Sequence, residues 1–201
     1  MEHDPNATDS CPPGLLELVS AGDQAAFRKL YAHFYKRLFH FALALVKIRE
    51  SAEEIVEDVF VRIWQQKENL HTIKNLRVYL YTATKNSSLN YLSQKARQSI
   101  TEPFDHIHIG LNDSAITPEQ ILITAEIHKK IVTAVEALPP RCKMIFKLVR
   151  EDGLKYKEIS EILNISVNTI DAQMAIAVKR ITLAIESDFD FPVKKIKPAS
   201  K

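Results

Sequence analysis

Apolar side chains recur at intervals of three and four residues in the first half of the chain, and this spacing is the feature that most restricts the fold. The longest run extends from Gln24 to Lys47, and its apolar positions are Phe27, Leu30, Tyr31, Phe34, Leu38, Phe41, Ala42 and Leu45. Such spacing places the apolar residues on one face of an amphipathic helix. Alternation of apolar and polar residues, which a half-buried strand requires, is nowhere convincing. The sequence therefore predicts an all-α fold.

Two more helices are predicted in the first half of the chain. One begins after Ser51, a residue type that caps helix N-termini, and has Glu53 and Glu54 in its first turn, where the helix dipole favours acidic side chains. The other extends from about Asn75 to Arg97 and has an apolar side and a polar side. Tyr79 lies on the apolar side, which favours a core position for it.

Prolines and glycines divide the second half into shorter helices. These helices are predicted at about 119–137, 139–150, 155–163 and 166–184. Pro139 separates the first two, because proline cannot donate a hydrogen bond in a helix interior but suits an N-terminus. Gly153 ends the second, because glycine adopts the positive φ of a helix C-cap. Residues 98–118 include Pro103, Gly110 and Pro118 and have no helical period, so they are expected to form a flexible linker.

Residues 156–170 (YKEISEILNISVNTI) have the pattern of a helix-turn-helix. Ser160 is small enough to stand where two helices cross, and Asn164, four residues later, tolerates the left-handed backbone conformation. Ser166 can cap the second helix through its hydroxyl. Four apolar residues are placed to hold the two helices together: Ile159, Leu163, Ile165 and Ile170.

The second helix of this motif has a predicted DNA-facing side. We expect it to dock inward through four apolar residues: Ile170, Met174, Val178 and Ile181. The 3.6-residue period then turns six residues outward: Asn168, Thr169, Asp171, Ala172, Ala175 and Lys179. The members of this set nearest the N-terminus of the helix would meet base edges in the major groove, whereas Lys179 and Arg180 would reach phosphates. The alternative is a helical hairpin that is packed for stability alone.

Charge falls in blocks along the chain of 201 residues, whose formal net charge is +2. Residues 67–100 have six basic side chains and one acidic one, and residues 129–201 have 14 basic and nine acidic. Between them, residues 101–128 have five acidic side chains and no Lys or Arg. Two basic blocks on either side of an acidic connector suggest two modules, each with a surface that binds a polyanion. The predicted divisions are a first module at 14–97, the linker at 98–118, a second module at 119–186 and a mobile basic tail at 187–201.

The residues that would indicate a metal, a cofactor or catalysis are sparse. Cys11 and Cys142 have no second ligand at metal-binding spacing, and His106 and His108 stand alone in the linker. There is no Gly-rich phosphate loop and no nucleophile with a base motif nearby, so we expect no enzyme and no cofactor. Without a signal peptide or an apolar run long enough to span a membrane, the chain is expected in the cytoplasm, with no membrane insertion.

Several stretches, in order, resemble bacterial RNA polymerase sigma factors. Residues 52–64 (AEEIVEDVFVRIW) resemble the helix that binds core polymerase in that family. Residues 75–86 and 89–92 follow, and the helix-turn-helix comes last, preceded by Leu138 and Pro139. The size and the two-module layout are similar to those of the extracytoplasmic-function (ECF) group, which keeps only sigma regions 2 and 4. The resemblance covers residues 14–184.

This resemblance implies roles for particular residues. Glu54, Asp58 and Arg62, spaced four apart on one helix, would dock on core polymerase. The −10 promoter element would be contacted and melted by residues of the first basic block: Lys74, Arg77, Lys85, Asn86, Lys95 and Arg97. Residues 66–75 would form a loop that cradles an extruded base, with Tyr79 and Tyr81 as possible stacking partners. The outward residues of the last helix would contact the −35 element.

The implied activity is that of an alternative sigma factor, which binds core RNA polymerase and promoter DNA and is sequestered by an anti-sigma factor. Binding rather than catalysis would be its mechanism. The sequence leaves two other classes open. One is a polymerase-independent helix-turn-helix regulator, which would bind a palindromic operator as a dimer. The other is a helical adaptor that binds only protein.

Overall fold

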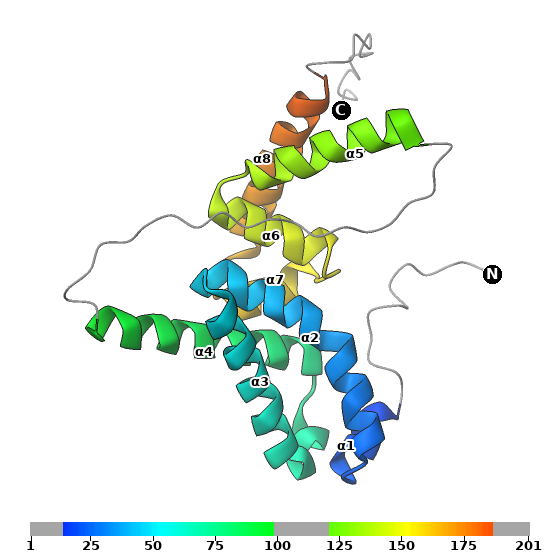
Figure 1. Cartoon of the computed structure of the whole chain (residues 1–201), viewed down its shortest axis with the longest axis vertical. Helices are drawn as coiled ribbons and strands as arrows, with labels where there is room; N and C mark the ends of the chain where they lie inside the picture. Colours follow the sequence, from blue (N-terminus) through cyan, green and yellow to red (C-terminus); the bar gives the residue numbers. More distant parts are fainter. Residues whose placement is uncertain (1–13, 99–120, 187–201) are drawn as a thin grey trace, which may run out of the picture.

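The structure of the protein, a computed structural model, describes residues 14–98 and 121–186. Within these two ranges every regular element is helical, so the all-α prediction is confirmed (Figure 1). The predicted tail, nearly all of the predicted linker and the paired residues His106 and His108 lie outside the described residues. None of the helices in the described ranges is both long and apolar enough to cross a membrane.

The first module has four α-helices and a short 3-10 helix. Their bounds are α1 Leu15–Ser20, α2 Gln24–Val46, α3 Arg49–Gln65, η1 Lys67–Thr72 and α4 Leu76–Gln98. Helix α2 begins where the Asp23 carboxylate accepts hydrogen bonds from the backbone N–H groups of Ala25 (2.7 Å) and Ala26 (3.1 Å). It ends at Lys47, whose left-handed backbone (φ 63°) turns the chain toward α3. Helices α2, α3 and α4 pack on one another around the apolar stripe of α2.

The start of α3 differs from the prediction. The helix begins at Arg49, with Ile48 at the N-cap, so Ser51 lies inside the first turn and does not cap it. The Ser51 side chain is buried, and its hydroxyl donates to the Tyr91 hydroxyl of α4 (2.8 Å). The sequence prediction was wrong here because the serine serves a contact between helices rather than a helix end.

The second module contains α5 Ile121–Glu136, α6 Pro140–Arg150, α7 Tyr156–Leu163 and α8 Val167–Glu186. As predicted, proline stands at the start of α6, where a missing N–H costs nothing. Gly153 has the expected positive φ of 65°, in a turn closed by the bond from the Leu154 N–H to the Leu148 carbonyl (2.9 Å). Helices α5, α6 and α8 pack together at the top of Figure 1, and α7 lies below them.

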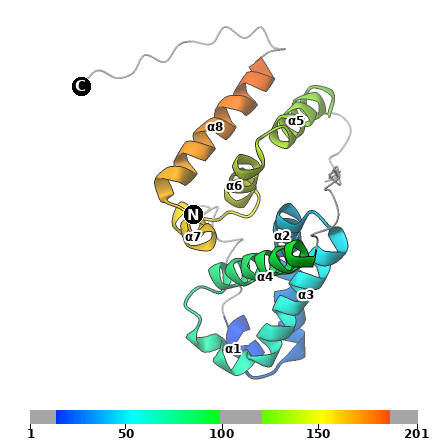
Figure 2. The same cartoon turned by 90° about the vertical axis from the view of Figure 1, so that its left-hand side faces the viewer.

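The two modules pack directly on each other. Figure 2 shows α7 and the lower end of α6 above α4, and α7 is the helix that contacts α4. A single cluster of buried apolar side chains continues from Leu80 and Tyr81 of α4 to Ile159 and Ile162 of α7. One buried cluster therefore crosses the module boundary, which the sequence analysis did not predict, and a second, smaller cluster lies within the second module.

Candidate nucleic-acid interface

The turn between α7 and α8 has the geometry expected of a helix-turn-helix. Asn164 adopts the left-handed conformation (φ 53°, ψ 52°) that the pattern predicted for it. Ser160 does more than leave room for a crossing, because its hydroxyl donates to the Ile165 carbonyl (2.6 Å). The Ile165 N–H in turn donates to the Ser160 carbonyl (3.3 Å). These bonds fix the angle at which α8 leaves α7.

Helix α8 has the predicted cap. The Ser166 hydroxyl accepts from the backbone N–H of Thr169 (3.1 Å) and lies 2.8 Å from the Thr169 hydroxyl. Thr169 is half-buried, and its side chain is engaged in this cap. Of the predicted base-reading residues at this end, Asn168 is therefore the more available to a ligand, because it is exposed.

The buried face of α8 differs from the predicted one at a single position. Ile170 and Met174 are buried and Ile181 is partly buried, but the next fully buried residue is Ala177, whereas Val178 is 46% exposed. With about 100° per residue, position 177 lies about 20° from Ile170 around the helix axis and position 178 about 80° away. The prediction for Val178 was wrong because the sequence analysis chose valine, the larger apolar side chain, over alanine. Ala177 lies closer to the direction of Ile170 around the helix axis.

The predicted outward residues of α8 are accessible. Asn168, Asp171, Ala172, Ala175 and Lys179 are all exposed, and their angular positions fall within one face. Arg180 is also exposed but leaves the helix about 100° from Lys179. The described geometry thus provides one continuous, mostly uncharged face with a lysine toward its C-terminal part.

The polar side of α4 has a mixed environment. Asn86 is exposed, as is Lys74 just before the helix, whereas Lys85 and Lys95 are half-buried. The Arg97 side chain lies outside the described residues. With about 100° per residue, Lys95 lies on the same side of α4 as Arg77 and Lys85 lies about 80° from both, whereas Asn86 lies on the opposite side. The C-terminal end of α4 extends beyond the rest of the first module (Figure 1).

Arg77 is the member of this basic set with a strong partner. Its Nη2 lies 2.6 Å from Oε2 of Glu158 in α7, and the two side chains are only 15% and 14% exposed. The other carboxylate oxygen of Glu158 accepts from the side-chain amide of Asn75 (3.0 Å). Burial alone would raise the pKa of Glu158, but bonds from the Lys155 N–H, Arg77 and Asn75 outweigh it and lower that pKa.

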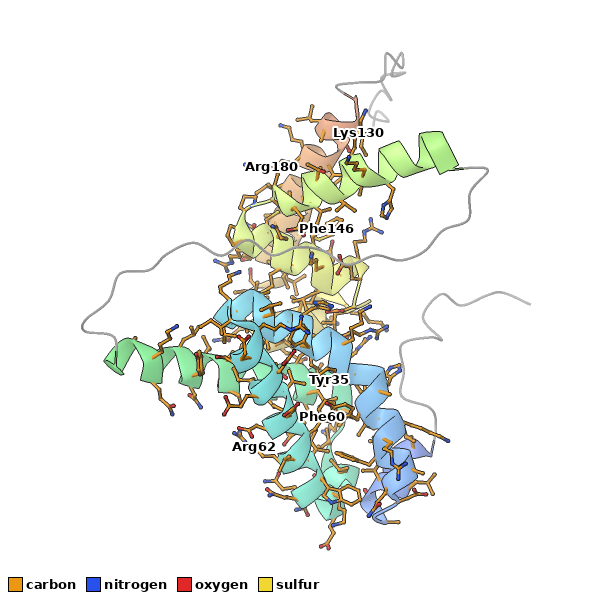
Figure 3. The ribbon with its side chains drawn as sticks, viewed as in Figure 1. Tyr35, Phe60, Arg62, Lys130, Phe146 and Arg180 are labelled. Atoms are coloured by element: carbon orange, nitrogen blue, oxygen red, sulfur yellow. The ribbon has the colours of Figure 1, made fainter. Side chains whose placement is uncertain are left out.

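The predicted polymerase-binding residues lie on the exposed side of α3. Asp58 and Arg62 are 61% and 58% exposed and 3.9 Å apart, and Glu54 is exposed one turn before them. Arg62 also donates to the Ser87 hydroxyl of α4 (3.4 Å). Exposed pairs at this separation add little stability, so these side chains are available to a partner. Figure 3 shows Arg62 and Arg180 in opposite parts of the molecule.

The segment after α3 differs from the expected loop. Residues 67–72 form η1, next to a hollow of about 250 Å³ lined by Gln24, Phe27, Arg28 and Trp64. The rings of Phe27 and Trp64 lie 4.8 Å apart, and the Lys67 ammonium is 5.2 Å from the Trp64 ring centre. Sequence reasoning missed this aromatic hollow, since its lining residues come from two helices.

Neither Tyr79 nor Tyr81 of α4 lies in the environment that the sequence analysis favoured for it. Tyr81 is fully buried, so it cannot stack on a base, and Tyr79, which was expected in the core, is 36% exposed. Burial and the nearby Asp152 carboxylate raise the pKa of Tyr81. Of the two, Tyr79 is the one that an approaching base could contact.

Two family models match the chain. Residues 30–98 match the model described as sigma-70 region 2, and residues 128–181 match the model described as sigma-70, region 4. The ECF RNA polymerase sigma-E factor of Escherichia coli K12 is 24% identical over 166 residues, covering 80% of this chain and 86% of that protein. The protein of the same name from Haemophilus influenzae is 23% identical, with 80% and 87% covered.

Two solved structures have a similar fold. One is the sigma factor RpoE of Bartonella quintana, crystallised with the anti-sigma factor NepR; its TM-score is 0.58, with 18% identity and 81% of this chain and 98% of that one covered. The other is CnrH in complex with the cytosolic domain of CnrY, with a TM-score of 0.51, 16% identity, and 87% and 97% covered. The order of the two matched regions agrees with the order of the two helical modules. The chain therefore belongs to the sigma-70 family, as a sigma factor of the ECF group.

Proposed function

We propose that this sigma factor brings core RNA polymerase to promoters by using three separate helical surfaces. Helix α3 binds the polymerase, α4 binds the −10 element and α8 binds the −35 element. The observation that carries this proposal is the exposed outer face of α8 in a capped helix-turn-helix, in the same chain as a region 2 match. Together these features provide DNA recognition and a place on the polymerase.

The polymerase surface consists of Glu54, Asp58 and Arg62. All three are exposed on α3. The charged atoms of Asp58 and Arg62 are 3.9 Å apart, so exchanging this ion pair for contacts with a partner costs little free energy. This row of two acidic side chains and one basic side chain, next to exposed Val61, suits a charged helical partner with an apolar strip.

The −10 surface is formed by α4 and the turn before it. Its members are Lys74, Arg77, Lys85, Asn86, Lys95 and Arg97. Cationic side chains close together on a helix supply salt-dependent affinity for phosphates and set the register of the DNA. The hollow beside Trp64 is a suitable place for an unstacked base, because aromatic rings and the Arg28 side chain line it.

The −35 surface is the outward face of α8. Asn168 and Asp171 stand nearest its N-terminus, where a recognition helix meets base edges, and Asn can pair with adenine while Asp can accept from cytosine. Ala172 and Ala175 can contact only apolar groups, such as the thymine methyl. Lys179 and Arg180 reach phosphates, and Thr169 contributes through the cap.

The chain acts by binding, in the cytoplasm, and we propose no catalytic step and no cofactor for it. Each DNA contact is weak alone and gains effective concentration when the polymerase holds both modules. Because the two similar solved structures hold an anti-sigma factor or a cytosolic partner domain, we also propose that an anti-sigma factor sequesters this chain.

A pull-down with bacterial core RNA polymerase, followed by run-off transcription on fragmented genomic DNA, tests the proposal. Retention together with new promoter-specific transcripts is the expected result. The variant Asp58→Arg should lose retention by the polymerase. Its control is Glu17→Arg at an exposed position of α1, since both variants reverse one exposed acidic charge. Duplex DNA binding without polymerase retention would instead favour an independent regulator, and no binding to either would favour a protein adaptor.

A further inference from the structure

We propose that a cluster of lysines contributed by α2 and α6 is a binding site for a compact polyphosphate anion. The cluster consists of Lys47, at the C-cap of α2, and of Lys143 and Lys147 on α6. This inference goes beyond the proposed function and does not depend on it, because none of these lysines belongs to the polymerase, −10 or −35 surface.

Lys47 is held in a backbone conformation that lysine rarely adopts. Its φ of 63° and ψ of 6° lie in the left-handed region, where glycine is the usual residue at the end of a helix. Its N–H donates to the Leu43 carbonyl (2.9 Å), which closes the last turn of α2. A glycine at this position would avoid the strain, so the lysine side chain, which is exposed, is a candidate for a role in binding.

The two lysines of α6 share one carboxylate. Glu136 of α5 accepts from Nζ of Lys143 (2.9 Å) and from Nζ of Lys147 (3.2 Å). Burial alone would raise the pKa of Glu136, but these bonds and charges outweigh it and lower that pKa. Glu136 is therefore ionised at neutral pH, and its single negative charge is divided between two ammonium groups.

The end of α2 adds a third ammonium group to this pair. The C-terminal half of α2 lies below α6 in Figure 1, and Val46 belongs to the same buried cluster as Ile145 of α6. Burial and repulsion by Lys143 lower the pKa of Lys47, and attraction by Glu136 offsets part of that effect. Within the described residues, the three lysines of the cluster thus share the charge of one carboxylate and keep an excess of two positive charges.

His40 extends the positive region along α2. It precedes Lys47 by two helical turns and lies about 20° from it around the helix axis. Burial lowers the pKa of His40, and so do the charges of three cations: Lys36 of α2, Lys147 of α6 and Arg49 of α3. Arg49 is itself paired with Glu53 (3.0 Å). Like charges that lower one another's pKa identify a place where added negative charge is stabilising.

The charge and the exposure of the cluster select the class of ligand. An excess of two positive charges matches an anion with two or more negative charges, and the lysine ammonium is a common point-charge partner of phosphate. The side chains of Lys143 and Lys147 are 26% and 29% exposed, which suits a compact anion better than a rigid DNA duplex. Inorganic polyphosphate and the phosphate chain of a nucleotide share this chemistry.

Isothermal titration of the full-length chain with sodium tripolyphosphate, and separately with ADP, tests the proposal. Lys47→Gln removes one ammonium group and leaves the ion pairs of α6 in place. The matched control is Lys29→Gln, which removes the same charge from an exposed position of the same helix. Glu136→Gln changes the charge in the opposite direction, and circular dichroism confirms that each variant is folded.

We expect the parent and Lys29→Gln to bind one tripolyphosphate with equal affinity. Lys47→Gln should bind at least about tenfold more weakly, because a charge-assisted hydrogen bond is lost. Glu136→Gln should bind more tightly, because the competing carboxylate charge is gone. Equal affinities for ADP and tripolyphosphate would assign the site to the phosphate chain alone, and tighter binding of ADP would assign it to a nucleotide.

The pH dependence provides a second readout. A bound anion favours protonated His40, so the affinity of the parent should rise relative to that of His40→Gln between about pH 8 and about pH 6. The comparison with His40→Gln separates this effect from the titration of the ligand itself. An unchanged ratio of the two affinities would remove His40 from the site.

Three results would overturn the proposal. The first is an absence of saturable binding to the parent chain. The second is an equal loss of affinity in Lys29→Gln and Lys47→Gln, which would indicate attraction by net charge alone. The third is a short DNA duplex that binds more tightly than tripolyphosphate and depends on Lys47, since the cluster would then be a DNA surface. None of these results involves core polymerase, so the proposed function is tested separately.

Discussion

The buried face of α8 can be tested by substituting two neighbouring residues, because the sequence pattern and the structure rank them in opposite order. The pattern turns Val178 inward, whereas the structure buries Ala177 completely and leaves Val178 46% exposed. Ala177→Leu and Val178→Ala therefore separate the two assignments. Both substitutions are compatible with a helix, so each reports packing rather than helix propensity alone.

The expected magnitudes follow from burial. Val178→Ala removes two methyl groups, which would contribute about 1.6 kcal/mol if fully buried and about half of that here. Alanine regains about 0.5 kcal/mol through its higher helix propensity, so the net loss stays below about 0.5 kcal/mol. Ala177→Leu adds three carbons among Val135, Leu138 and Cys142, and such overpacking costs about 1–3 kcal/mol.

Urea unfolding followed by far-ultraviolet circular dichroism measures both variants. With an m-value of about 2 kcal/mol/M, Ala177→Leu should lower the midpoint by about 1 M, and Val178→Ala should shift it by less than about 0.25 M. A larger loss for Val178→Ala than for Ala177→Leu would refute the assigned face of α8. The outward position of Lys179 would then have to be reassigned as well.

Three further predictions concern binding and pH. Asp58→Arg should lower the affinity for core polymerase in a pull-down titration while leaving the circular dichroism spectrum unchanged; equal affinity would remove α3 from the polymerase surface. Lys179→Ala should weaken promoter binding across all sequences and flatten its salt dependence. Asn168→Ala should instead change discrimination at one or two base pairs. If both variants weakened binding equally across sequences, α8 would not be the recognition helix. Because the pKa of Glu158 is lowered in the folded chain, its stabilisation is present above the ordinary value of 4.5 and lost as pH falls through the folded pKa. The unfolding free energies of the parent and of Glu158→Gln should therefore differ at pH 7, and the difference should shrink as the pH is lowered below 4.5; a difference that does not change with pH would contradict this prediction.

The helices were largely predictable from sequence because their signals are local. The apolar stripe of α2, Pro140 at the start of α6, Gly153 and Asn164 each act within one or two helical turns, and the structure agrees with all four. The start of α3 was misplaced because Ser51 bonds to Tyr91, forty residues away. A residue type that favours the N-cap marks a position at which a helix can start, but contacts with other helices determine the position at which it starts.

The packing of the modules could not be predicted because nothing in the local pattern links its partners. Arg77 and Glu158 lie 81 positions apart, and each is an ordinary charged residue of an amphipathic helix. The sequence also assigned both modules positive surfaces, which predicts separation rather than contact. Burial of Tyr81 and exposure of Tyr79 follow from the same omission, since Tyr81 belongs to the cluster that continues into α7.

The sites themselves were predicted to different degrees. On α8, the helical period was sufficient to identify the exposed face apart from the capping role of Thr169. On α4, the basic block and the family resemblance together marked Arg77 as an expected DNA contact, but neither could reveal its carboxylate partner. The hollow at Trp64 needed the contact between α2 and α3, which brings Phe27 beside it.

The bonds inside the helix-turn-helix determine which parts of the chain move together. Ser160 and Ile165 are joined in both directions across the turn, and Ser166 closes the first turn of α8. These bonds join α7 and α8 into one rigid unit. The outward face of α8 therefore has a fixed orientation relative to α7, and a ligand of that face meets it without any rearrangement of the turn.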